Sequence, residues 1–414
     1  MFVLFDQKKQ RIPIKIWLKG LEELETECIQ QATNLANLPF AFRHVALMPD
    51  THSGYGMPIG GVLASREVVI PNAVGVDIGC GVAFIRTDLP SSLLRKVNTP
   101  SGELGRLIVG QIMRSIPTGF QHQKTAQKSI LLDKFREEIT GDHILYPREL
   151  VKEVANGYRQ LGTLGGGNHF IELQEDEEGR LGIMVHSGSR NFGYKICRYF
   201  NQLAKEKNRS SDLQVPPEYD LAYLFEKSKE GQAYIRWMKL ALDFARDNRQ
   251  LMLERVVEIV ADTYAHYARI PSFTTKMEVN AHHNYAALEE HFGEEVWIHR
   301  KGAIRAGKGE LGIIPGAMGS FSYIVEGRGN PESFLSCSHG AGRKMGRNEA
   351  LRRFTTEEVL TDLKARDVVL GKRKKSDVAE EFIKAYKDIQ EVLAEQEDLV
   401  RPILRLQTVC VVKG

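Results

Sequence analysis

The sequence predicts an α+β fold. Two segments, residues 44–88 and 294–326, are rich in valine, isoleucine and glycine, which is typical of strands joined by tight turns. Residues 218–268 instead repeat apolar side chains at helical spacing. Because strand and helix patterns do not alternate regularly along the chain, an α+β arrangement is favoured over a doubly wound parallel sheet.

The first half of the chain adds four further elements. Residues 19–36 carry apolar side chains at helical spacing, and residues 120–158 also have a helical composition. The stretches "LGTLGGGNHFIELQ" (161–174) and "RLGIMVHSGSRNFG" (180–193) each combine an apolar run with a glycine loop, which predicts a strand beside a tight turn.

The second half is expected to add a loop, two helices and a closing strand to the helical segment 218–268 and the strand-rich segment 294–326. The polar stretch 205–218 contains two prolines and is expected to form an exposed loop. Residues 356–365 and 376–397 are expected to be helices, and "LRLQTVCVVKG" (404–414) has the β-branched composition of a strand. We find no internal repeat and no linker, so one domain is expected.

Composition excludes several classes of protein. The chain has 414 residues, of which 42% are hydrophobic and 26% charged, as in soluble globular proteins. The net charge of +3 is too small to indicate nucleic-acid binding by itself. No segment resembles a signal peptide or a membrane span. The five cysteines are scattered and odd in number, which favours a reducing cytoplasm over a disulfide framework.

Five polar stretches share one setting, a glycine loop beside an apolar strand. Each contains a cysteine or a histidine, and together they hold five of the twelve histidines in the chain. A single buried histidine is usually only a hydrogen-bonded core residue, but five such stretches form a pattern. Imidazole, thiolate and carboxylate together are ligands of transition metals. The stretches are "VDIGCG" (76–81), "GGGNHFIE" (165–172), "MVHSGSRNFG" (184–193), "NAHHNYA" (280–286) and "CSHGAGRKMGR" (337–347).

The stretch "VDIGCG" is the most informative of the five. Its glycines let the backbone turn so that Asp77 and Cys80 point the same way, and a thiolate has enough lone pairs to bridge two metal ions. The alternative is a glycine-rich bulge with an inert buried cysteine. Ligand type leaves the metal open, since cysteine and histidine favour zinc whereas the carboxylate favours a harder ion such as manganese.

The stretch "CSHGAGRKMGR" has a different chemistry. Arg343 and Arg347 are four residues apart, so on a helix they would share a face and could clamp a phosphate. His339 beside such a clamp is a candidate acceptor of a phosphoryl or nucleotidyl group. The plainer alternative is a basic helix start with an incidental histidine. The basic loop "HRKGAIRAGKG" (299–309) could be a second polyanion cradle or merely a solvated charged loop.

These stretches, taken together, resemble the RtcB family of GTP-dependent RNA ligases. The resemblance runs from about residue 44 to the last residue and is specific because nine motifs occur in family order. They are "MPDTHSGYGMPIGG", "GVDIGCG", "GTLGGGNHFIE", "VHSGSRNFG", "HHNYA", "HRKGAIRA", "PGAMGSFSYIV", "SHGAGRKMGR" and a terminal "VVKG".

The resemblance implies a fold and a reaction. Residues 1–414 would form a single RtcB-like domain, with mixed sheets, packed helices and glycine-rich loops lining a central cleft for metal and nucleotide. Family members join an RNA 2′,3′-cyclic phosphate or 3′-phosphate end to a 5′-hydroxyl end, using GTP and manganese. Their partners include RNA and, for some members, an archease-type activator; no membrane is involved.

The resemblance also implies roles for single residues. Two Mn²⁺ ions would share Cys80, one held with Asp77 and His169 and the other with His186 and His283. His339 would carry GMP as a covalent phosphoramidate, and Glu172 would read the guanine edge. The remaining nucleotide contacts would be Asn168, Asn284, Ser322, Tyr386 and Lys413. Arg190, Arg343 and Arg347 would meet substrate phosphate. The chain departs from the family at Ala317, where many members place a serine that touches GMP.

Two rival functions fit part of this pattern. A metal-dependent phosphoesterase could open RNA cyclic phosphates with the same metals and never ligate, but His339 would then have no covalent role. A non-enzymatic RNA-binding protein would be strongly basic with exposed aromatic side chains. The small net charge and the metal-ligand pattern speak against that reading.

Overall fold

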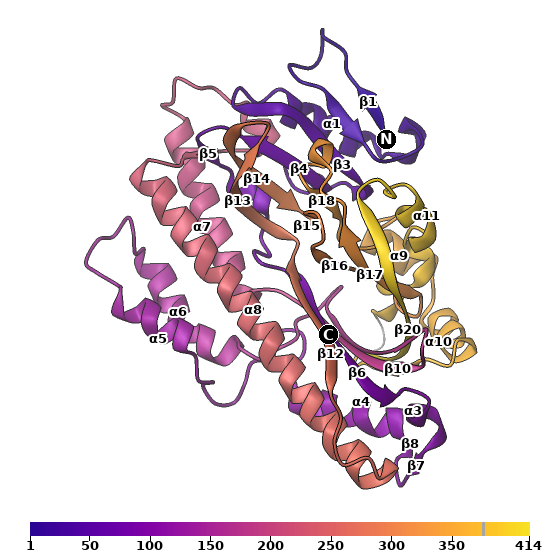
Figure 1. Cartoon of the computed structure of the whole chain (residues 1–414). Coiled ribbons are helices and arrows are strands. Elements are labelled where there is room, and N and C mark those ends of the chain that lie inside the picture. The colour runs from indigo at the N-terminus through magenta and orange to yellow at the C-terminus, as the bar shows by residue number, and fades with distance from the viewer. Residues whose placement is uncertain (375–376) are drawn as a thin grey trace.

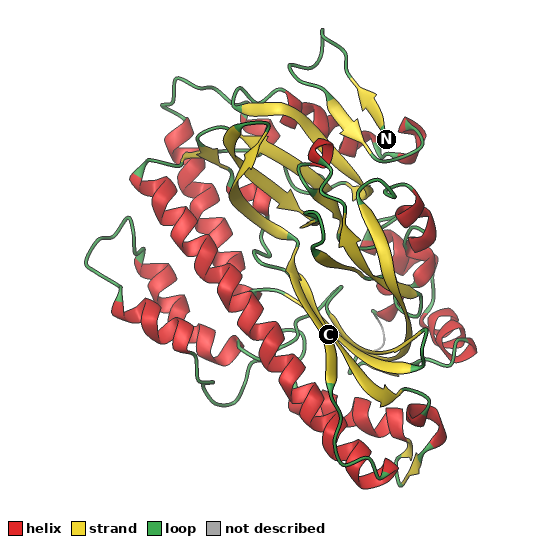
Figure 2. Ribbon diagram, in the orientation of Figure 1, coloured by secondary structure: helices red, strands yellow, loops and turns green. Residues whose placement is uncertain are grey.

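Two large sheets form the centre of the computed structural model, which describes residues 1–374 and 377–414 (Figures 1 and 2). One has six strands, in the order β1 (Phe2–Leu4), β2 (Ile14–Ile16), β3 (Ala41–His52), β4 (Ile59–Ser65), β14 (Glu294–Lys301) and β13 (Asn284–His291). The other follows the order β12 (Thr275–His282), β6 (Gly81–Pro90), β10 (Arg180–Ser187), β9 (Phe170–Asp176), β20 (Val400–Lys413), β17 (Phe321–Gly327) and β16 (Leu311–Ile314), with β19 (Val369–Gly371) paired to β20.

Most neighbouring strands in these sheets are antiparallel. The parallel pairs are β2 with β3 and β19 with β20. Smaller two-stranded sheets pair β5 (Val68–Val69) with β11 (Leu224–Phe225), β7 (Asn98–Thr99) with β8 (Gly102–Glu103), and β15 (Ala303–Arg305) with β18 (Ser336–Ser338). Antiparallel sheets with separate helices confirm the predicted α+β class. The single domain over residues 1–414 stays a prediction.

Helices cover the outside of the sheets. The longest, α8 (Lys229–Thr263), packs against β6 and β10, and α7 (Arg190–Asn208) lies beside it (Figure 1). Farther out on that side lie α5 (Ile130–Glu137) and α6 (Arg148–Gln160), whereas α9 (Arg347–Arg353), α10 (Thr356–Ala365) and α11 (Ile389–Ala394) lie on the other side. The remaining helices are α1 (Thr26–Ala36), α2 (Pro71–Val74), α3 (Leu93–Lys96) and α4 (Leu104–Ser115).

Helix α8 is the main packing surface for the eight-stranded sheet. Its 35 residues span roughly 50 Å at 1.5 Å per residue. Trp237 and Phe244 are buried among the outer helices, whereas Met252 and Val256 are buried against the sheet. The helix begins at a capped position, because the Ser228 side chain accepts a hydrogen bond from the Gly231 amide. None of the helices in the two described ranges is long and apolar enough to cross a membrane.

The local patterns predict some helices well and others poorly. The helix over 356–365 is confirmed, and it begins with a reciprocal cap between Thr355 and Glu358. The expected helix over 376–397 is wrong: the chain forms two short 3₁₀ turns and then α11. Residue 376 lies outside the described ranges. The expected loop over 205–218 is helical up to Asn208, where α7 ends.

A buried arginine on α8 joins the ends of three strand segments. Arg249 Nη1 donates to Gly79 O, before β6, at 2.8 Å and to Ser187 O, the end of β10, at 2.9 Å. Its Nε donates to Asn280 Oδ1 in β12 at 2.9 Å. Arg249 has no exposed surface, and burial lowers the pKa of its guanidinium to about 10, so it is still charged at neutral pH.

Removing this guanidinium should destabilise the protein. In Arg249→Met the side-chain volume is nearly kept, but two buried carbonyls lose their donor, and each such loss costs about 1–3 kcal/mol. We expect a markedly lower thermal unfolding midpoint in a fluorescence melt. Arg246→Met is the control, because Arg246 lies on the same helix but is exposed. Equal midpoints for the two variants would contradict the anchoring role of Arg249.

Candidate active site

The candidate metal ligands meet at one end of four adjacent strands. In the eight-stranded sheet, β12, β6, β10 and β9 are neighbours. Their register pairs Gly81 with both Ser187 and His282, and it pairs His186 with Phe170. Residues next to these strand ends therefore lie close together in space although they are far apart in the sequence. This register brings together Asp77, Cys80, His169, His186 and His283.

The turn before β6 holds Asp77 and Cys80 on the same side. The Cys80 amide donates to Asp77 O at 3.1 Å, and Gly79 has a φ of 72°, which glycine adopts without strain. Gly81 has no room for a side chain, because a Cβ there would lie 2.2 Å from Ala281 O of the neighbouring strand. The glycines of "VDIGCG" are therefore required by the turn and by the close approach of β12.

The donor atoms form two overlapping groups. Cys80 Sγ lies 3.3 Å from His169 Nε2 and 3.3 Å from His186 Nε2. Asp77 Oδ2 lies 3.1 Å from His169 Nε2. One group is Asp77, Cys80 and His169; the other is Cys80, His186 and His283; within each group the donor atoms lie within 4.8 Å of one another. Cys80 belongs to both, so two ions could share its sulfur.

The protonation of these side chains fits metal binding. Burial, together with the neighbouring imidazoles, holds the pKa values of His186 and His283 well below the usual value, so both rings are neutral. Burial and the adjacent Asp77 raise the pKa of the Cys80 thiol well above its usual value, so a cation is needed to ionise it. His283 Nδ1 is buried without a hydrogen-bond partner among the residues described. This donor set suits a transition-metal ion.

His339 lies beside this cluster, in the loop after β18. Its ring centroid is 4.7 Å from that of His283. His339 Nδ1 is 2.7 Å from Asp50 Oδ2, and the His339 amide donates to the same oxygen at 3.1 Å. Burial would raise the pKa of Asp50, but its interactions with His339 outweigh burial and hold that pKa below the usual value. An ionised carboxylate only accepts, so Nδ1 donates a proton to Asp50, and Nε2 is the ring nitrogen that remains for other contacts.

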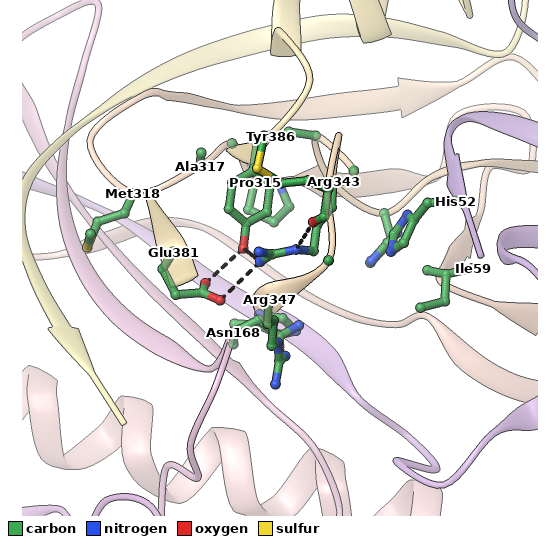
Figure 3. A pocket seen from close by; sticks show the side chains of 18 of the residues that line it. His52, Ile59, Asn168, Pro315, Ala317, Met318, Arg343, Arg347, Glu381 and Tyr386 are labelled. Atoms are coloured by element: carbon green, nitrogen blue, oxygen red, sulfur yellow. Dashed lines mark hydrogen bonds and ion pairs between the residues drawn. The ribbon is translucent and has the colours of Figure 1, made fainter. Parts of the chain in front are cut away.

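A cavity of about 740 Å³ opens next to His339 (Figure 3). This volume is typical of a site for a nucleotide-sized ligand. The expected nucleotide-binding residues that line it are Asn168, Glu172, His339, Tyr386 and Lys413, and both Arg343 and Arg347 line it too.

Asn284 and Ser322, also expected to contact the nucleotide, do not line this cavity. The Asn284 side chain donates from Nδ2 to Asp77 O, and its Oδ1 accepts from the Gly302 backbone amide. Ser322 Oγ accepts hydrogen bonds from the Gln174 side chain and the Gly316 amide. In this structure both side chains therefore support the walls of the site.

The two arginines of "CSHGAGRKMGR" do not share a helix face, so that prediction is wrong. Gly342 adopts a φ of 72°, Arg343 forms an isolated bridge with Tyr386, and α9 begins only at Arg347. Arg343 is tied down by Glu381 and by Glu380 O, whereas Arg347 is exposed. Arg347 is therefore the more available of the two cations.

Glu381 organises one wall of the cavity and was not found from the sequence. Its Oε2 accepts from Lys413 Nζ and from the Tyr386 hydroxyl, each at 2.9 Å, and its Oε1 is 3.3 Å from Arg343 Nη1 (Figure 3). No local pattern marks this glutamate, because it lies in a segment with a helical composition. Asp50 was also missed, although a carboxylate at the end of the apolar run "HVALMPD" could have drawn attention to it.

Glu172 lies on β9 at the inner end of the cavity. Its Oε2 accepts from Gln174 Nε2 at 2.7 Å and from Thr408 Oγ1 at 3.1 Å. Burial raises the pKa of Glu172 to about 7, against the opposing effect of these hydrogen bonds and of Lys413. Glu172 is therefore a buried carboxyl that is close to half-ionised at neutral pH.

Arg190 lies at the start of α7, next to the candidate ligand His169. It donates from Nη2 to Gly119 O at 2.8 Å and from Nε to Thr163 Oγ1 at 3.1 Å. Gly165 is closely packed between Arg190 and His169, since a Cβ at that position would lie 2.2 Å from Arg190 Nη1 and 2.3 Å from His169 Nδ1. A cation is thus held next to a candidate metal ligand.

A Cys/His/Asp cluster, a histidine held at Nδ1 by a carboxylate, and a nucleotide-sized cavity whose lining includes Arg343, Arg347 and Lys413 together define a site suited to phosphoryl or nucleotidyl transfer. Comparison with known proteins identifies the family. The family model of the tRNA-splicing ligase RtcB matches residues 31–414. The chain therefore belongs to the RtcB family.

Individual relatives match nearly end to end. The chain is 42% identical to the RNA-splicing ligase RtcB of Escherichia coli (strain K12), covering 98% of each protein. It is 30% identical to the tRNA-splicing ligase RtcB of Pyrobaculum aerophilum, over 98% of this chain and 95% of the relative. The RNA-splicing ligase RtcB of Mycobacterium tuberculosis is 32% identical, over 93% of this chain and all of the relative.

Replacing Cys80, whose sulfur belongs to both groups of donor atoms, should abolish metal binding by both groups. We expect Cys80→Ala to retain no tightly bound Mn²⁺ after dialysis, measured by elemental analysis, because each group loses one of three ligands. Cys197→Ala is the matched control, since Cys197 is also a buried free cysteine but packs in the core of the outer helices. Full metal content in Cys80→Ala would contradict the two-ion interpretation.

Proposed function

We propose that this protein is an RNA ligase that joins an RNA 2′,3′-cyclic phosphate or 3′-phosphate end to a 5′-hydroxyl end through a His339–GMP intermediate. The observation that carries the proposal is the Asp50–His339 pair, which engages Nδ1 and leaves Nε2 as the ring nitrogen available for attack beside a nucleotide-sized cavity. Membership in the RtcB family, whose members compared above are named RNA-splicing or tRNA-splicing ligases, supports it.

In the first step His339 Nε2 attacks the α-phosphorus of GTP. A P–N bond forms, the bond to the bridging oxygen breaks, and pyrophosphate leaves with the electron pair. Asp50 stabilises the positive charge that develops on the imidazole, since it holds the Nδ1 proton. Asp50 therefore orients the nucleophile and favours the adduct.

In the second stage GMP moves to the RNA. An oxygen of the RNA 3′-phosphate attacks the phosphorus on His339, the P–N bond breaks, and the RNA end becomes activated. The 5′-hydroxyl then attacks the RNA phosphorus, loses its proton, and displaces GMP. A 2′,3′-cyclic end is first opened by water to the 3′-phosphate.

The cluster of candidate ligands fits two Mn²⁺ ions that share Cys80. Asp77 and His169 would complete one site, and His186 and His283 the other. When bound, such ions withdraw charge from the reacting phosphates and make pyrophosphate a better leaving group. Manganese is preferred to zinc because a carboxylate takes part and GTP phosphates are hard oxygen ligands.

Most residues that line the cavity are assigned to GTP, whereas the cations Arg190 and Arg347 are assigned to RNA. Glu172 would accept hydrogen bonds from the guanine N1–H and exocyclic amine. Asn168, Tyr386 and Lys413 would contact GMP, and Asn284 and Ser322 stay predictions for that role. Arg190 and Arg347 would bind RNA phosphate, and Arg343 would support the pocket wall through Glu381. An archease-type activator also stays a prediction.

The main alternative is a phosphoesterase that opens cyclic phosphates without ligation. The same metal ligands would serve that reaction. It leaves two features without a purpose, namely the Asp50–His339 pair and the nucleotide-sized cavity beside it. These features favour ligation.

The central test is adduct formation on His339. Incubation with GTP and Mn²⁺ should raise the intact mass by one GMP, and the adduct should be lost in acid and retained in alkali. His339→Ala should lose the adduct and ligation while keeping its fold by circular dichroism. Asp50→Asn should slow adduct formation by roughly 10²–10⁴-fold, because the histidine loses its orienting charge.

The phosphoesterase alternative predicts a different outcome. In that case the wild-type protein would open cyclic phosphate ends but gain no mass with GTP and Mn²⁺. An adduct on a residue other than His339 would also overturn the assignment of the nucleophile.

Nucleotide binding should depend on the ionisation of Glu172. Only the carboxylate accepts two hydrogen bonds from guanine, and the pKa of Glu172 is raised to about 7. Below this pKa the carboxyl takes up a proton, so GTP affinity should fall by about tenfold between pH 8 and pH 6. Calorimetric titration measures this change.

Glu172→Gln is the control for this pH dependence. The GTP phosphates titrate equally with both proteins, so the difference between the two profiles isolates Glu172. ATP should bind much more weakly than GTP to the wild type at pH 8, because adenine N1 is an acceptor that faces the carboxylate. Parallel profiles for the two proteins would refute the role of Glu172.

A further inference from the structure

One aromatic side chain beside the site is fully exposed. Phe120 has its whole ring in solvent. It follows Gly119, which has a φ of 64°, in the loop between α4 and α5. A phenylalanine of this exposure adds nothing to the core of the protein.

The backbone around Phe120 is firmly held. Pro117 O accepts from the Leu164 amide at 2.9 Å, and the Gly119 amide donates to Gly165 O at 2.8 Å. Arg373 Nη1 donates to the Gln121 side chain at 2.6 Å. The ring is therefore presented on a fixed turn, so that little backbone entropy would be lost when a ligand stacks on it.

The same turn is joined directly to the candidate phosphate-binding arginine. Arg190 Nη2 donates to Gly119 O at 2.8 Å, one residue before Phe120. Gly165, which accepts from the Gly119 amide, is the glycine packed between Arg190 and His169. The turn that carries the exposed ring is thus bonded directly to this cation and to the glycine that packs against a candidate metal ligand.

We propose that Phe120 is a stacking platform for the terminal base of the RNA strand that carries the 3′-phosphate. This inference rests on the proposed function, since it takes Arg190 to bind that phosphate. Every base has a π-face, so stacking on an aromatic ring holds a strand end without selecting its sequence. Phe120 and Arg190 would recognise adjacent parts of one nucleotide, the base and its phosphate.

Stacking predicts a loss that depends on the base itself. In Phe120→Ala the KM for RNA should rise roughly tenfold, with a small change in kcat. Phe120→Trp should restore the wild-type KM. With an RNA whose 3′-terminal nucleotide is abasic, wild type and Phe120→Ala should have the same KM, because there is no base to stack. Phe225→Ala, at an exposed phenylalanine on β11 that does not line the cavity, is the matched control.

Fluorescence separates this inference from the ligase proposal. RNA with 2-aminopurine at its 3′-phosphate end should be quenched on binding to the wild type and not to Phe120→Ala, whether or not ligation occurs. Quenching only of a 5′-terminal 2-aminopurine, or equal quenching by both proteins, overturns the platform. A wild type that quenches the 3′ probe but forms no GMP adduct overturns the ligase proposal and leaves the platform standing.

Discussion

The site depends on the hydrogen bonds that the guanidinium of Arg249 donates. This guanidinium is fully buried and hydrogen-bonds to the turn before β6, the end of β10 and the β12 strand. These segments carry or flank Cys80, His186 and His283. A single rigid fork with several donors can fix three chain segments at once, which a lysine could not do. Arg249 lies on the long helix α8, and the apolar residues of α8 pack this helix against the sheet.

Carboxylates that are buried, or half-buried in the case of Asp77, extend the same principle around the cavity. Asp50 is paired with His339, Asp77 with His169, and Glu381 with Lys413 and Arg343. Each pair keeps a charge inside the protein only because a partner compensates its desolvation. Glu172 lacks such a close cationic partner, so burial raises its pKa to about 7. Under the proposed function, the different environments would suit these carboxylates to different tasks, namely orienting a nucleophile, holding a metal, shaping a wall and reading a base.

Local patterns predicted the fold class and several elements but failed where long-range contacts decide. The helix over 356–365 was correct because its cap and its apolar spacing are both local. The helix over 376–397 was wrong because Glu381 and Tyr386 both contact Arg343. On an α-helix, side chains five residues apart point about 140° away from each other, so both contacts require an irregular segment. The predicted shared helix of Arg343 and Arg347 is wrong because Arg343 pairs with Tyr386 in an isolated bridge and Gly346, between the two arginines, is extended.

By itself, the sequence predicted the α+β class, the family resemblance and most of the candidate residues of the site, because cysteine, histidine and glycine motifs are local patterns. The resemblance had already grouped the five candidate ligands around Cys80, but only the tertiary structure brings their donor atoms together, since that depends on the register of four strands. It also assigned Asp50 to His339 and Glu381 to Lys413, pairs that are 289 and 32 residues apart in the sequence. Such pairs form because a buried charge needs a partner that compensates its desolvation. Which residues become partners depends on how the chain packs and cannot be read from neighbouring residues in the sequence.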